Sequence, residues 1–149
     1  MRLLVQRSLN SSVKVDKKIV GKIDFGLVVL VGFSQTDDIS DIDYMINKLI
    51  NLRIFEDENN VMNKSVLDVK GAILSISQFT LCADTKKGNR PSYASAMKHE
   101  EAKAMYDLFN KKLKEKIDVE TGIFGSDMEV NIINNGPVTI LLESRSKND

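Results

Sequence analysis

An unbroken apolar run between Gly26 and Phe33 constrains the fold of this chain more than any other segment. Leu27 to Val31 are all aliphatic, which is typical of a strand buried on both faces. A second apolar run, Ala72 to Ile76, follows Gly71. Both runs are far shorter than the ~20 residues that a membrane-spanning helix needs. We therefore expect two interior strands in a soluble protein.

Two further segments carry apolar residues at helical spacing. The first contains Ile42, Met45, Ile46, Leu49 and Ile50, and the second contains Ala102, Met105, Tyr106, Phe109 and Leu113. We expect Ser40 to cap the first helix, because Asp43 follows it in a pattern close to a capping box. Lysines crowd the end of the second helix, at Lys111, Lys112, Lys114 and Lys116, and there they complement the helix dipole.

The remaining apolar segments alternate in the manner of strands. We expect strands at Arg2–Ser8, Val13–Val15, Ile19–Ile23, Met128–Ile133 and Val138–Leu142, and a loop or weak hairpin within Arg53–Lys70. Strands outnumber helices, and several are paired by hairpins. The pattern predicts one α/β domain over residues 1–149, with mixed or antiparallel sheets and the helices packed on one side.

Composition excludes several classes of function. Cys82 is the single cysteine, which rules out an intrachain disulfide and a cysteine-rich zinc site, and His99 is the single histidine. Twenty-one basic and 21 acidic residues give zero net charge, so the chain is no strongly basic nucleic-acid binder, although a local basic patch remains open. We expect no signal peptide, no metal or cofactor, and a cytoplasmic location.

The polar end of the second buried strand is the first candidate site. Strand ends in open α/β sheets bind ligands, because their backbone groups lack ladder partners. Here Gln78 offers an amide, Ser77 and Thr80 offer hydroxyls, and free N–H groups can stabilise an oxyanion. The alternative is an ordinary capped strand end. We interpret Cys82 as a buried residue beside this site and His99 as a solvent-exposed or capping histidine, neither of them catalytic.

Two loops complete the candidates. Asn134–Pro137 contains asparagine-glycine and is typical of a tight turn between strands, with an ordinary trans proline bond. Lys86–Pro91 is a short basic loop just after the first candidate site. It is either simply solvated or meets phosphate.

These residues together resemble the D-aminoacyl-tRNA deacylase family, formerly called D-tyrosyl-tRNA deacylases. The sequence Ser77–Leu81 is identical to the family's serine-glutamine-phenylalanine-threonine-leucine signature, and Asn134–Thr139 fits its asparagine-x-glycine-proline-valine-threonine motif. Met1–Arg7, Gly88–Ser92 and Thr121–Gly125 resemble neighbouring family segments. Two signatures in the right order, within a resemblance that runs nearly end to end, make this a specific match.

The resemblance implies a three-layer β/β/α fold, a homodimer, and hydrolysis of the ester between a D-amino acid and the terminal adenosine of tRNA. It implies a cis Gly136–Pro137 bond that reaches into the partner's site and rejects L-amino acids by clash. Arg7 would support this element, with help from Met128. The backbone N–H groups of Phe79 and Thr80 would face the ester carbonyl. Ser77 and Gln78 would shape the pocket and hold the adenosine.

Other functions remain open at this stage. The chain could bind tRNA ends without deacylating them, or hydrolyse small esters with Ser77 or Thr80 as nucleophile. Within the family interpretation, the adenosine 2′-hydroxyl assists the attacking water, and glycine, which has no side chain to exclude, is also removed from tRNA. We expect tRNA as the partner, with no DNA and no membrane. Zero net charge makes the Lys86–Arg90 loop and the second helix the expected sources of phosphate contacts.

Overall fold

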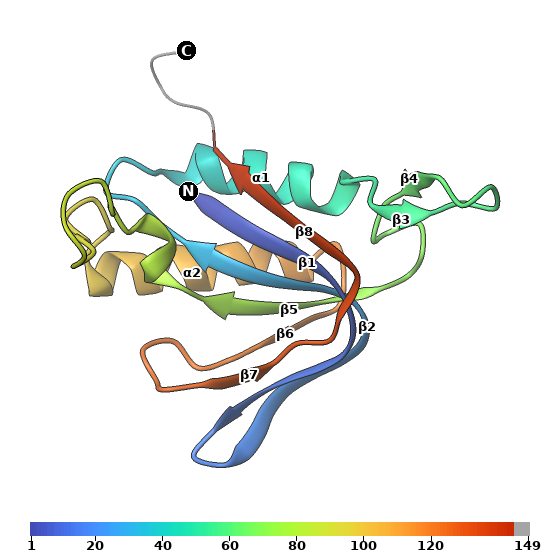
Figure 1. Ribbon diagram of the computed structural model, residues 1–149, viewed down its shortest axis with the longest axis horizontal. Coiled ribbons are helices and arrows are strands. Elements are labelled where there is room, and N and C mark those ends of the chain that lie inside the picture. Colours follow the sequence, from blue (N-terminus) through green and yellow to red (C-terminus); the bar gives the residue numbers. More distant parts are fainter. Residues whose placement is uncertain (145–149) are drawn as a thin grey trace.

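The computed structural model describes residues 1–144 and is a mixed α/β structure, as predicted (Figure 1). In chain order the elements are β1 (Arg2–Val15), β2 (Lys18–Gly32), α1 (Ile39–Asn51), β3 (Phe55–Glu56), β4 (Met62–Lys64), β5 (Ala72–Ser77), the 3₁₀-helix η1 (Phe79–Cys82), α2 (His99–Lys114), β6 (Val119–Thr121), β7 (Glu129–Asn131) and β8 (Asn134–Glu143). No helix within this part of the chain is both long and apolar enough to span a membrane.

The main sheet is mixed. Its strand order is β6-β5-β2-β1-β7, and β8 also pairs with β1. β1 and β2 form one long antiparallel hairpin rather than the separate short strands expected, whereas β5 lies parallel to both β2 and β6. The hairpin turns at Asp16 and Lys17, both with positive φ, as a two-residue hairpin turn requires. β3 and β4 form the expected small hairpin.

The sheet bends strongly, so that the far ends of β1 and β2 curl away from the helices (Figure 1). A small core lies inside this bend, where Val13 and Ile23 pack with Val28, Leu74 and Ile76. The neighbouring residues Leu27 and Ile73 belong instead to the larger core beneath the helices. β2 and β5 are therefore buried on both faces, as their apolar runs predicted. The two halves of the bent sheet form the two β layers that were expected, and the helices form the third layer.

Both helices cover the same face of the sheet and contribute to the same core. They are linked on the surface by an ion pair of 2.6 Å between Lys112 and Asp43. The prediction that Ser40 caps α1 is wrong. The N-cap is Asp38, whose carboxylate accepts from the Ser40 backbone N–H at 2.9 Å, while Asp41 accepts from the Asp38 N–H. The capping box begins two residues earlier because an aspartate already occupies that place.

The prediction of a tight turn at Asn134–Pro137 is also wrong. β7 and β8 both run antiparallel to β1, on the edge that β2 does not occupy, so the chain continues in one direction between them. A register shift between Gln6 and Ser8 marks the place where this edge is interrupted. The Gly136–Pro137 bond is cis, as the family resemblance implies and contrary to the ordinary preference for trans.

Candidate active site

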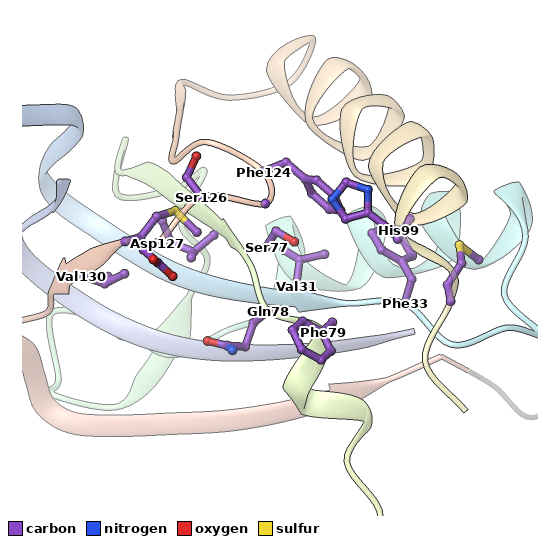
Figure 2. A pocket seen from close by; sticks show the side chains of 15 residues that line it. Val31, Phe33, Ser77, Gln78, Phe79, His99, Phe124, Ser126, Asp127 and Val130 are labelled. Atoms are coloured by element: carbon purple, nitrogen blue, oxygen red, sulfur yellow. The ribbon is translucent and has the colours of Figure 1, made fainter. Parts of the chain in front are cut away.

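A pocket of about 560 Å³ lies at the carboxyl end of β5. Figure 2 shows Ser77, Gln78 and Phe79 on its strand-end side, with His99 and Phe124 near α2. The pocket is lined by Val31, Phe33, Ile76, Ser77, Gln78, Phe79, Met97, His99, Ala102, Phe124, Gly125, Ser126, Asp127, Met128 and Val130. Its walls are mostly apolar with a few polar groups, the usual character of a small-ligand site.

The strand end is shaped by the change from β5 into η1. The Gln78 backbone N–H still donates to Val31 at 2.7 Å, and the chain then turns into the 3₁₀-helix. The N–H groups of Phe79 and Thr80 begin that helix, and within residues 1–144 neither donates to another protein group. A Cβ at Gly32 would lie 2.9 Å from the Gln78 carbonyl oxygen, so glycine lets η1 pack closely on β2. The fold thus leaves two adjacent donors free at the start of η1, where Phe79 lines the pocket and Thr80 follows it.

The side chains of this segment have distinct environments. Gln78 donates from Nε2 to the Thr80 hydroxyl at 2.5 Å, so that hydroxyl already accepts a hydrogen bond. Phe79 is 55% exposed and packs edge-on against Tyr93, with ring centroids 5.1 Å apart. Ser77 is half-buried and lines the pocket. Thr80 is exposed and is not among the lining residues.

The opposite wall is aromatic. The Phe124 ring lies 5.1 Å from the His99 ring and 5.7 Å from the Tyr106 ring, measured between centroids. Tyr106 is buried and donates from its hydroxyl to the Ser75 carbonyl at 2.7 Å. Burial raises the pKa of Tyr106 above its ordinary value, although the Ser75 hydrogen bond opposes this. Tyr106 therefore stays neutral and holds the wall in place.

Of the two predicted alternatives for His99, solvent-exposed or capping, the structure shows the first. His99 is exposed, as expected, but it makes no capping bond, because Lys98 occupies the N-cap position and has no side-chain hydrogen bond there. Instead it lines the pocket, with its Nδ1 3.4 Å from a Glu100 carboxylate oxygen. Cys82 is buried as predicted, donates to the Phe33 carbonyl at 3.3 Å, and has a pKa raised by burial.

A second group of predicted residues surrounds the cis bond. Arg7 is 7% exposed and donates from Nε to the Asn135 carbonyl at 2.9 Å and from Nη1 to the Ile54 carbonyl at 3.0 Å. Gly136 and Pro137 are exposed. Neither they nor Arg7 are among the residues that line the pocket of their own chain. The guanidinium therefore ties the exposed corner of β8 formed by Gly136 and Pro137 to the segment that precedes β3.

The structure thus divides the sequence-predicted residues into two groups. Ser77, Gln78, Phe79 and Met128 line the pocket, Gly136 and Pro137 form the corner that Arg7 anchors, and Thr80 belongs to neither group. Phe124 and His99 were not expected to line the pocket. The only available signal for Phe124 was its place in the Thr121–Gly125 segment of the family resemblance. No group of three histidine, cysteine or acidic residues in the described chain is arranged to hold a metal ion.

This fold and pocket define a ligand-binding α/β protein whose site lies at a strand end. The family model for D-Tyr-tRNA(Tyr) deacylase matches residues 4–143, and the chain belongs to that family of aminoacyl-tRNA ester hydrolases. A solved structure named c-Myc DNA unwinding element binding protein is 40% identical, with a TM-score of 0.94, and the match covers 98% of this chain and 100% of that one. A probable eukaryotic D-amino acid tRNA deacylase, 18% identical, shares the fold with a TM-score of 0.80 over 95% and 97% of the two chains.

Proposed function

We propose that this protein hydrolyses the ester between a D-amino acid and the terminal adenosine of tRNA. Water adds to the ester carbonyl carbon, the bond to the ribose oxygen breaks, and a D-amino acid and a tRNA with a free hydroxyl are released. Family membership supports the reaction. The observation that supports it at this site is the pocket at the end of β5, where Phe79 and the adjacent Thr80 begin η1 with N–H groups that lack protein acceptors in the described chain.

The two free N–H groups are the groups that stabilise the transition state. Negative charge develops on the carbonyl oxygen when water attacks, and preorganised donors stabilise it. Ser77 and Gln78 shape the pocket for the adenosine, with the apolar and aromatic walls suited to a base. The Thr80 hydroxyl accepts from Gln78 and is not the nucleophile. The adenosine 2′-hydroxyl, adjacent to the ester, assists the attacking water.

Selectivity for D-amino acids comes from the corner at Gly136 and Pro137. Both residues are exposed and lie outside the pocket of their own chain, which supports a role in the pocket of a second subunit. In such a homodimer the corner's backbone occupies the space that an L side chain would need. Glycine has no side chain to exclude, so glycyl-tRNA is also hydrolysed. Arg7 keeps the corner in position through its bond to Asn135.

The test compares hydrolysis of D-tyrosyl-tRNA and L-tyrosyl-tRNA by the purified protein. We expect strong preference for the D ester, and equal rates would contradict the proposal. Thr80→Ala should retain most of the rate, because the Thr80 hydroxyl is not the nucleophile in this mechanism. If it were the nucleophile, the substitution would remove nearly all of the rate enhancement. A tRNA ending in 2′-deoxyadenosine should be hydrolysed far more slowly. Unchanged hydrolysis of that substrate would exclude assistance by the RNA.

A second candidate function is nucleic-acid binding without catalysis. It is favoured by the relative named as a DNA unwinding element binding protein, which is 40% identical. The deacylation assay separates the two functions, because a binding protein would retain D-tyrosyl-tRNA and leave its ester intact. Serine-reactive inhibitors distinguish a third possibility, an ester hydrolase that uses Ser77 or Thr80 as its nucleophile. They would inactivate such an enzyme but would not affect the proposed mechanism.

A further inference from the structure

A second groove adjoins the pocket on its α2 side. It has a volume of about 510 Å³ and lies between α2 and the chain that follows β6. Phe124 lines both the groove and the pocket, so the two hollows are neighbours. The groove is lined by Lys103, Tyr106, Asp107, Asn110, Lys111, Lys114, Thr121, Gly122, Ile123 and Phe124. A ligand that extends from the pocket past Phe124 would therefore enter this groove.

The charge of the groove is positive in a chain whose net charge is zero. Three lysines and one aspartate line it. Lys103 is paired with Asp107 at 2.8 Å, so these two charges largely cancel. Lys111 and Lys114 form no ion pair with any residue in the range 1–144. They lie three residues apart on α2, which places them on one face of the helix.

The groove also offers apolar surface beside this charge. Ile123 is 45% exposed and lines the groove, and Phe124 contributes an aromatic side chain to it. Apolar or aromatic surface next to lysines is the combination by which proteins bind single-stranded nucleic acid, since bases stack while the cations meet phosphates. A peptide ligand would leave the continuity with an adenosine pocket unexplained.

We propose that this groove binds the nucleotides that immediately precede the terminal adenosine of the substrate RNA, with Lys111 and Lys114 on their phosphates. The proposal rests on the proposed function, because the pocket must hold the adenosine for the strand to leave past Phe124. The groove thereby makes the protein favour aminoacyl-tRNA over small esters as substrates. Binding energy gained there lowers KM without entering the chemical step.

The experiment uses two substrates, D-tyrosyl-tRNA and the minimal ester D-tyrosyl-adenosine, with the double variant Lys111→Ala/Lys114→Ala. For D-tyrosyl-tRNA we expect KM to rise about tenfold or more with kcat unchanged, from the loss of two phosphate contacts. The log–log salt dependence of kcat/KM should become shallower by about 1.4, at ~0.7 per single-strand contact. Hydrolysis of D-tyrosyl-adenosine should be unaffected, and Lys111→Arg/Lys114→Arg should restore KM.

A matched control is Lys48→Ala/Lys112→Ala. It removes the same charge from the last turns of both helices, but neither lysine lines the groove, and Lys112 pairs with Asp43. If the control variant shows as large a rise in KM for D-tyrosyl-tRNA as the groove variant does, the rise comes from the loss of positive charge in general. The proposal is then overturned. It is equally overturned if the groove variant keeps the wild-type KM and salt slope, or if it loses hydrolysis of both substrates together.

The groove can be tested even if the proposed function fails. In that case the wild-type protein hydrolyses neither ester, and fluorescence anisotropy with a labelled single-stranded RNA ending in adenosine replaces the kinetic assay. The groove variant should then bind this RNA about tenfold or more weakly than the control variant, with the same reduction in salt slope. Equal affinities would overturn the groove proposal independently of catalysis.

Discussion

Replacing Gly136 with alanine tests how tightly the corner beside the cis bond is built. Gly136 has φ +134°, a conformation that residues with side chains rarely adopt, and this conflict costs ~1–3 kcal/mol. A Cβ there would also lie 2.9 Å from Arg7 Nη2 and 2.8 Å from Val138 Cγ2. Displacing the guanidinium weakens charged hydrogen bonds worth ~1.5–3 kcal/mol each. We expect Gly136→Ala to lower the free energy of unfolding by about 3 kcal/mol.

Urea unfolding measures this loss, and Gly88→Ala is the matched control. Gly88 also has positive φ, +65°, but nothing lies within 4 Å of its added Cβ, so only the left-handed backbone cost of ~1–2 kcal/mol applies. The ratio of D- to L-tyrosyl-tRNA hydrolysis should fall for Gly136→Ala and stay at the wild-type value for Gly88→Ala. Equal stability and equal selectivity of the two variants would show that the surroundings of Gly136 do not matter.

Three further variants address other parts of the site. Arg7→Lys should destabilise the protein by ~1.5–3 kcal/mol and lower the D-to-L ratio, because one ammonium cannot replace both guanidinium bonds; a wild-type unfolding curve would contradict this. His99→Gln should change kcat by less than about tenfold, since a general base contributes ~10²–10⁴, and a hundredfold loss would make His99 that base. Tyr106→Phe should reduce the decrease in the free energy of unfolding that the wild-type protein shows at alkaline pH. Burial raises the pKa of Tyr106, so its contribution is complete below about pH 10 and declines as the pH rises further, which unfolding at about pH 9 and about pH 11 would reveal.

Much of the fold could be predicted from local pattern. The aliphatic run Leu27–Val31 and the helical spacing of Ile42 to Ile50 both occupy the elements expected of them. These predictions succeed because side-chain periodicity is a property of the segment itself, and burial only selects the face. The cap of α1 was misplaced by two residues, since Asp38 and Ser40 are both acceptable caps and the sequence does not rank them.

The site was only partly predictable, because it depends on contacts between segments that are distant in the chain. The signature Ser77–Thr80 could be recognised as a segment, and its place at a strand end was expected. The contribution of His99 and Phe124 to the same pocket depends on how α2 and the following loop pack against β5. No local pattern in either segment indicates that contact.

The sequence by itself determined the two interior strands, the two helices and the signature residues at the end of the second interior strand. Only the tertiary structure decided that the chain keeps its direction along β1 through Asn134–Pro137, although Asn135–Pro137 lie outside the pairing, and that Arg7 anchors this segment. The asparagine-glycine pair does favour a turn locally, but Asn134 and Thr139–Glu143, on either side of it, pair with β1 over a long range and satisfy their backbone groups there. Long-range hydrogen bonding and burial outweigh a local preference of about a kcal/mol, and they bring together residues that are distant in the chain.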